Sequence, residues 1–292
     1  MDRSSVEVFL TVAQEGSFRK AANKLGYTQA GISYIIHSIE EDLGLTLFIR
    51  ERSGVTLSPE GRALLPQIKK IDNDARALRQ SVNDLKGLEQ GSITVQVFDS
   101  VSIHWLPSII KEFKRDFPGV QVLFTSEEDS AKAEERVMTG EVDCSFFMTD
   151  VSSDLDVFPL KKDSLLAIVA PDCKTIKGNV FPVDQLGKIP YIAMKYDSNT
   201  GMRNVFSRNN ATPDIAYHMD NDHAAIAMAS KGLGYCIFPE LLVRNTPFDV
   251  RVLELDKPQY RTISIGTRSM ATASKACLKF IEYTRRWVEE NE

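Results

Sequence analysis

The chain of 292 residues contains only four cysteines, scattered without the paired spacing of a zinc ribbon or a disulfide framework. Its longest unbroken apolar runs are far shorter than a bilayer span, so the sequence predicts no membrane-spanning helix and no membrane partner. The start, Met1-Asp2-Arg3-Ser4, lacks the apolar core of a secretion signal. We therefore expect a cytoplasmic protein whose cysteines are reduced.

Catalytic motifs are also missing from the sequence. It contains no glycine-rich phosphate loop, no nucleophile elbow and no HExxH helix, and therefore predicts neither an enzyme nor a bound cofactor. The segment from His218 to His223 resembles a metal site. However, Asp220 or Asp222 can equally cap a following helix, and no third cluster of ligands has suitable spacing. We expect no metal.

What the chain does have is the composition of a soluble globular protein, with 43% hydrophobic and 26% charged residues, in a length that suits about two domains. The net charge of -5 would by itself count against a nucleic-acid partner. Its distribution matters more. Residues 1–90 hold twelve basic and twelve acidic residues, and no acid lies between Glu15 and Glu40, where three bases occur, namely Arg19, Lys20 and Lys24.

Residues 1–57 have the pattern of a small helical domain. Val6, Phe9, Leu10 and Ala13 share one helix face, Ser17 can cap a second helix, and Thr28 can cap a third that stops at Gly44. Two strand-like segments follow, Leu47–Arg50 and Val55–Leu57. Three helices and a hairpin are the plan of an all-α winged helix-turn-helix domain.

In such a domain the third helix enters the major groove of double-stranded DNA, with its first residues against the base edges. Gln29 could pair with adenine, Ala30 could touch a thymine methyl, and Thr28 and Ser33 could reach bases or phosphates. Arginines on the wing would hold phosphates or enter the minor groove. The alternative is a protein-interaction domain with a solvated polar face. The predicted DNA-binding residues are Thr28, Gln29, Ala30, Ser33, Tyr34, His37, Arg50 and Arg52.

Residues 58–90 predict a long linker helix, which opens with the cap and proline of Ser58-Pro59-Glu60. Its apolar positions follow steps of four and three residues, the spacing of a coiled coil, so we expect this helix to form a homodimer. The alternative is an amphipathic helix packed on its own domain. The predicted dimerisation residues are Leu64, Ile68, Ile71, Ala75, Leu78, Val82 and Leu85.

The third segment, residues 91–292, alternates strand-like and helical stretches. Such alternation predicts an α/β domain with a mainly parallel sheet and helices on both faces. Ligands in such domains bind at the carboxyl ends of the strands.

The sequence resembles the LysR-type transcriptional regulators across essentially its whole length. The N-terminal resemblance rests on Phe9 to Phe18, Ala21-Ala22, Leu25, Gln29, Ser33, Ile39-Glu40, Leu43-Gly44, Leu47-Phe48, Arg50 and Leu57 to Gly61. Downstream it rests on Leu106-Pro107, Phe113, Phe117-Pro118, Gly140 to Asp143, Gly232 to Gly234 and Phe238-Pro239. Ala30, Tyr34 and His37 depart from the proline and basic residues common in the family, so the base preference of relatives does not transfer.

The resemblance implies that residues 91–292 form an effector-binding domain like a periplasmic binding protein. Its subdomain 1 would comprise about 91–164 and 265–292, and its subdomain 2 about 165–264. The effector would be a small organic molecule, such as a carboxylate. The positions that match effector contacts in relatives are Ser100, Ser130 and Thr200, and Ser102, which lies near Ser100, is a further candidate. Ser130 could equally be a helix cap.

The expected function is therefore sequence-specific DNA binding controlled by an effector. The resemblance also implies a homotetramer and leaves contact with RNA polymerase open. The alternative function is a small-molecule-binding protein or an enzyme with an accessory helical interaction domain.

Overall fold

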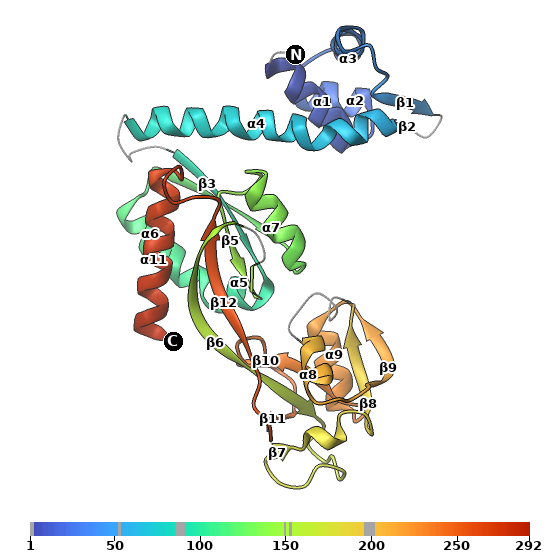
Figure 1. Ribbon diagram of the computed structural model, residues 1–292, viewed down its shortest axis with the longest axis vertical. Coiled ribbons are helices and arrows are strands. Elements are labelled where there is room, and N and C mark those ends of the chain that lie inside the picture. Colours follow the sequence, from blue (N-terminus) through green and yellow to red (C-terminus); the bar gives the residue numbers. More distant parts are fainter. Residues whose placement is uncertain (1–2, 52–53, 86–90, 149, 152–153, 196–201) are drawn as a thin grey trace. The chain divides into compact units, whose positions relative to one another are not determined.

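The structure is a computed structural model that describes residues 3–51, 54–85, 91–148, 150–151, 154–195 and 202–292. The chain forms two compact units (Figure 1). Unit 1 comprises residues 1–86 and 139–141, and unit 2 comprises residues 87–138 and 142–292. Within the described ranges, no helix has the length and apolarity needed to cross a bilayer.

Unit 1 is a winged helix-turn-helix followed by one long helix, as the sequence predicts. Its three short helices pack on one another, and α1 lies against the first part of the long helix (Figure 1). The elements are α1 (Arg3–Glu15), α2 (Phe18–Leu25), α3 (Gln29–Leu43), the antiparallel wing strands β1 (Phe48–Glu51) and β2 (Gly54–Leu57), and α4 (Pro59–Leu85).

Local chemistry fixes where α2 and α3 begin and end. The hydroxyl of Ser17 accepts a hydrogen bond from the Lys20 amide at 3.4 Å, and that of Thr28 accepts from the Gly31 amide at 3.0 Å. Each caps backbone donors that have no partner inside the helix. Gly26 ends α2 in the left-handed region, with φ of 72°, where a side chain would be strained.

Hydrogen bonds to one partly buried carboxylate hold the wing against α3. Oε1 of Glu40 accepts hydrogen bonds from the backbone amides of Leu47 at 2.7 Å and Phe48 at 3.2 Å. The ring of Phe48 packs in the core beside Phe9 and Phe18. The start of β1 is therefore held by α3 on one side and by the aromatic core on the other.

The predicted coiled-coil stripe on α4 has two different environments. Ile68 is only 4% exposed and packs with Leu64 on the core of unit 1, so these two residues do not lie on a free seam, which corrects the prediction. Farther along the helix, Ile71, Leu78 and Val82 are exposed. Ala75 is half-buried, and the side chain of Leu85 lies outside the described residues. The first part of α4 packs on the core of its own domain, and only the later part exposes apolar residues to solvent.

The first lobe of unit 2 is a sheet covered by helices on both faces. Phe146 packs in one hydrophobic cluster with α6 and α11, whereas its neighbour Phe147 packs in another with α7, as expected for side chains that alternate across a sheet. The strand order is β4 (Val120–Ser126), β3 (Gly91–Val97), β5 (Cys144–Phe147), β12 (Tyr260–Thr267), β6 (Asp156–Val169), and the helices are α5 (Asp99–His104), α6 (Leu106–Asp116), α7 (Ser130–Met138) and α11 (Lys275–Asn291).

The second lobe is built on the far half of β6, a strand of 14 residues that runs through both lobes (Figure 1). Residues 156–164 of β6 pair with β12, and residues 165–169 pair with β10 and β11. The lobe contains β7 (Val180–Phe181), β8 (Pro190–Met194), β9 (Asp214–Met219), β10 (Cys236–Pro239), β11 (Arg251–Leu255), α8 (Met202–Arg208), α9 (Asp222–Ser230) and α10 (Glu240–Val243).

The expectation of a mainly parallel sheet is wrong. β3 pairs parallel with β4 and β5, but β12 is antiparallel to β5 and β6, and β10 and β11 are antiparallel to β6. The reason is the return of the chain: β12 brings it back from the second lobe alongside β6, in the opposite direction.

The division of the α4 stripe gives a test of stability. Ile68→Ala should lower the free energy of unfolding of the winged helix-turn-helix by about 2–4 kcal/mol, because it leaves a cavity in a packed core. Hydrogen exchange of the α1–α3 amides measures the change. Ile71→Ala, at a residue 52% exposed, is the control and should leave their protection nearly unchanged. Equal effects of the two variants would contradict the division.

Candidate functional site

The first candidate site is the exposed face of α3 in unit 1. Gln29, Ala30, Tyr34 and His37 are exposed there, and Tyr34 reaches 74%. Thr28 is exposed too, although its hydroxyl is already used to cap the helix. These predicted residues thus share one accessible surface at the start of α3, which has the size and polarity to face base edges in a major groove.

Two of the predicted residues meet across the domain. Nη2 of Arg50 on β1 donates a hydrogen bond to the hydroxyl of Ser33 on α3 at 2.9 Å. The guanidinium also lies 4.7 Å from the centre of the Phe18 ring, a cation–π geometry. The sequence predicts Arg50 on the wing, and the structure shows that its side chain extends from wing strand β1 to the edge of the α3 face. Arg52 lies outside the described residues.

This face carries less net positive charge than the sequence suggests, because two of its basic side chains lie next to carboxylates. Nζ of Lys24 lies 2.7 Å from Oε1 of Glu15, and this interaction lowers the pKa of Glu15. The exposed imidazole of His37 lies 3.3 Å from the Glu41 carboxylate. Arg19 and Lys20 are exposed on the neighbouring α2. A phosphate backbone would therefore meet Arg19, Lys20 and Arg50, while the start of α3 itself has no acidic side chain.

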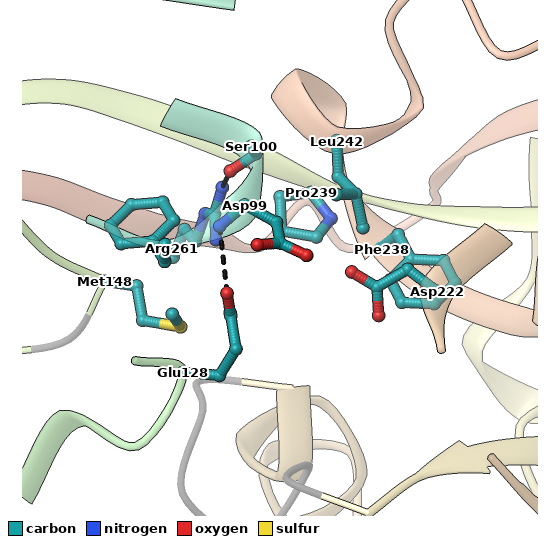
Figure 2. Close-up of a pocket in the computed structure, with 10 residues that line it drawn as sticks. Asp99, Ser100, Glu128, Met148, Asp222, Phe238, Pro239, Leu242 and Arg261 are labelled. Carbon is teal, nitrogen blue, oxygen red and sulfur yellow. Dashed lines mark hydrogen bonds between the residues drawn. The ribbon is translucent and has the colours of Figure 1, made fainter. Parts of the chain in front are cut away.

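The second candidate site is a small, partly open cavity between the two lobes of unit 2 (Figure 2). Ser100, one of the predicted effector residues, lines it. Ser102 does not; its hydroxyl donates to the backbone carbonyl of Asp99 at 2.8 Å. Thr200 lies outside the described residues. The residues that line the cavity are Phe98, Asp99, Ser100, Glu128, Met148, Asp222, Phe238, Pro239, Leu242 and Arg261.

Ser130 is not the cap of α7, which resolves the alternative that the sequence left open. The carboxylate of Asp129 accepts from the amide of Ala131 at 3.0 Å and takes the capping role. The hydroxyl of Ser130 is buried and has no hydrogen-bond partner within the described part of the chain. Likewise, the cap of α9 is Asn221, whose side chain accepts from the Ala224 amide at 2.9 Å, and not Asp220 or Asp222.

A buried ion pair forms the wall of the cavity where the lobes join. The side chain of Arg261 on β12 is 6% exposed and that of Asp163 on β6 is 1% exposed. Asp163 accepts from Nε of Arg261 at 2.9 Å through one oxygen and from the Leu241 amide at 3.0 Å through the other. Nη2 of Arg261 donates to the hydroxyl of Ser100 at 2.8 Å. Burial lowers the pKa of Arg261, and Asp163 opposes that effect.

Three carboxylates that the sequence did not single out as effector contacts also face the cavity. They come from the start of α5, the loop before α7 and the start of α9 (Figure 2), namely Asp99, Glu128 and Asp222. Burial, with the charges of Asp99 and Asp222, raises the pKa of Glu128 to about 7, and burial with the charge of Asp99 raises that of Asp222 to about 6. Arg261 opposes both shifts, His223 opposes the second, and the Asp99 amide opposes the first.

The sequence gives only a weak indication that these acids line a binding site. Asp99 follows a strand and Asp222 precedes a helix, positions at which an acid is ordinarily a helix-terminus residue. Only the packing of the two lobes brings them together. Across the described ranges, no group of three or more histidines, cysteines or carboxylates could hold a metal ion.

Comparison with known families decides between the two classes of function that the sequence left open. Residues 4–62 match the model of the bacterial regulatory helix-turn-helix protein, lysR family, and residues 86–289 match the LysR substrate binding domain. The chain belongs to the LysR family of transcriptional regulators. It combines a helix-turn-helix DNA-binding domain with an effector-binding domain.

Relatives of this LysR-family regulator match it over nearly their whole length. The HTH-type transcriptional regulator YvbU of Bacillus subtilis (strain 168) is 27% identical over 98% of this chain and 98% of its own. The crystal structure of CbnR, a LysR family transcriptional regulator, superposes with a TM-score of 0.74 at 19% identity and covers 99% of both chains. A structure of full-length CbnR with its target DNA has a TM-score of 0.72 at 20% identity and covers 98% of this chain and all of CbnR.

The raised pKa of Glu128 gives a prediction about pH. Because this pKa lies near 7 in the folded protein and at 4.5 ordinarily, the folded state holds the extra proton, and its stability falls as pH rises from about 4.5 to about 7. Glu128→Gln should reduce this fall by about 1–3 kcal/mol. Urea unfolding of the effector-binding domain signal at pH 5 and pH 8 measures it. Glu135→Gln, on the exposed side of α7, should keep the native slope; an unchanged slope in Glu128→Gln would contradict the assignment.

Proposed function

We propose that this regulator binds operator DNA as a homodimer that inserts α3 of each protomer into successive major grooves. The observation that carries the proposal is the hydrogen bond from Arg50 to Ser33, which holds a wing cation beside the exposed polar start of α3. Gln29, Ala30, Ser33 and Tyr34 would face base edges, with His37 at the rim. Arg50, together with Arg19 and Lys20 on α2, would hold phosphates.

The proposed dimer seam is the later part of α4, through Ile71, Leu78 and Val82. Three exposed apolar residues at helical spacing on one helix are an apolar stripe that a second copy of the helix would cover. The earlier stripe residues, Leu64 and Ile68, would join the seam to the DNA-binding core, so that the dimer sets the separation of the two α3 helices. Assembly into a tetramer and contact with RNA polymerase are finer proposals that follow the family plan.

The proposed effector site is the cavity between the lobes. A ligand there would touch Ser100 from one lobe and Phe238 or Leu242 from the other, so binding would favour one relative position of the lobes. Such a shift is how a small molecule would alter the spacing of the DNA-binding domains. The predicted Ser100 is part of this proposal, whereas Ser102 and Ser130 do not line the cavity.

Duplex binding and its salt dependence test the DNA contacts. On a duplex selected from a random library, the native protein should lose affinity steeply with added salt. Arg50→Ala should weaken binding by about threefold to tenfold and lower the salt slope by about one, because one phosphate contact is lost. Fluorescence anisotropy measures both. Arg208→Ala, which removes an exposed arginine from α8, should change neither; a native salt slope in Arg50→Ala would contradict the phosphate contact.

Leu78→Glu tests the seam. A charge placed in an apolar interface should raise the dimer dissociation constant by at least about tenfold and weaken duplex binding with it. Sedimentation velocity measures the first effect and anisotropy the second. Leu78→Met, which keeps an apolar side chain, should remain dimeric. A native sedimentation profile for Leu78→Glu would refute the seam.

A further inference from the structure

A serine hydroxyl on a recognition helix can read a base in two ways, because it can donate a proton or accept one. At Ser33 the structure favours one of them. The inference rests on the proposed insertion of α3 into a major groove and concerns the base atoms that Ser33 can bind there. Ser33 lies one helical turn beyond Gln29 on the same side of α3, half-buried at the edge of the exposed face.

The oxygen of Ser33 is already engaged inside the domain. Nη2 of Arg50 donates a hydrogen bond to it at 2.9 Å, so one of its lone pairs is occupied. The proton of the same hydroxyl has no acceptor among the described residues. In a helix such a proton often returns to a backbone carbonyl, as that of Ser230 on α9 does with Ala227 at 2.7 Å. The proton of Ser33 is therefore left for a ligand.

Two contacts hold Arg50 beside Ser33. Its guanidinium lies 4.7 Å from the centre of the Phe18 ring, a side chain only 7% exposed. The strand that carries Arg50 begins at Phe48, whose amide donates to Glu40 on α3 at 3.2 Å. The protein therefore orients the Ser33 hydroxyl before any base approaches, and little freedom is lost when a base binds.

The charge of Arg50 acts in the same direction as its hydrogen bond. A cation beside the oxygen of Ser33 favours electron-rich acceptors and repels the hydrogens of an amino group. In the major groove, guanine presents two acceptors, N7 and O6, adenine presents N7, and thymine presents O4. Cytosine presents an amino group and no acceptor. A hydroxyl that is oriented as a donor beside a cation therefore discriminates against cytosine and suits guanine best.

We propose that Ser33 is a specificity-determining residue that donates its hydroxyl proton to a base acceptor, and that Arg50 is the positioning residue that sets this direction. Arg50 uses one N–H group on Ser33 and keeps the others for phosphate. Its two effects are separable. A phosphate contact changes the affinity for every sequence alike, whereas the orientation of Ser33 changes the preference at one base pair of each half-site.

The experiment deletes single base atoms from the selected duplex and measures binding of the full chain by fluorescence anisotropy. In one set of duplexes, 7-deazaguanine or 7-deazaadenine replaces the N7 acceptor by a C–H group, and analogues that lack guanine O6 or thymine O4 are used likewise. A second set lacks the amino groups of cytosine or adenine. At one position of each half-site, loss of an acceptor should weaken native binding about tenfold.

Ser33→Ala should respond to the same acceptor deletion by less than about twofold, because the donor is already absent. Ser38→Ala is the matched control. It removes an exposed hydroxyl from another side of α3 and should keep the native response. Coupling of Ser33 to a deleted amino group, or to none of the deleted atoms, would overturn the proposal.

Arg50→Ala tests the positioning role. Without the guanidinium the Ser33 hydroxyl is free to turn, so deletion of the acceptor should weaken binding of this variant by no more than about threefold. If Arg50 acted on phosphate alone, the variant would bind every duplex more weakly by the same factor and keep the native tenfold response of about that size. That result would overturn the role assigned to Arg50.

The same measurements distinguish a failure of DNA binding from a failure of this assignment. If no duplex is selected, or if affinity does not fall with added salt, α3 does not bind DNA as proposed and the assignment of Ser33 falls with it. If a duplex binds with the expected salt dependence while Ser33→Ala responds to acceptor deletion as the native protein does, only the donor role of Ser33 is refuted.

Discussion

The ion pair between Asp163 and Arg261 is the interaction on which the effector-binding domain depends. Both residues lie where β6 and β12 pass from one lobe to the other, and each binds a second element, the α10 amide for Asp163 and the Ser100 hydroxyl for Arg261. A pair this deeply buried is costly to break, since loss of one partner leaves a charge without compensation. It therefore fixes the position of Arg261 in the cavity wall where the lobes join.

In the DNA-binding domain the comparable constraint is the carboxylate of Glu40. Its two hydrogen bonds to the start of β1 tie the wing to the helix that would read the bases. Because β1 is held in this position, Arg50 lies next to Ser33, and the guanidinium on the wing and the hydroxyl on α3 belong to one continuous surface. A small domain with few basic residues on its recognition helix can in this way place its phosphate contacts with little freedom, which limits the entropy lost on binding.

In both units, residues from separate helices and strands come together in a candidate functional surface only when the chain is folded. On α4, the first apolar residues stabilise the domain that binds DNA, and the later ones remain for a partner. In the cavity, acids at or before the starts of three separate helices line one space. Assembly, DNA binding and effector recognition would thus depend on distinct sets of side chains, and a ligand can alter DNA binding through a shared conformational equilibrium without contact between the sites.

The amino-acid sequence by itself determined the winged helix-turn-helix and the long helix. These follow from local signals: the caps Ser17 and Thr28, the glycine stops, and apolar spacing that the chain carries without reference to distant residues. Tertiary structure alone decided that Ile68 is core, that Arg50 meets Ser33, that β12 runs antiparallel to β6, and that Asp99, Glu128 and Asp222 share one cavity. The physical reason is distance along the chain, because a local pattern specifies which face of an element is apolar, while only packing specifies which faces meet.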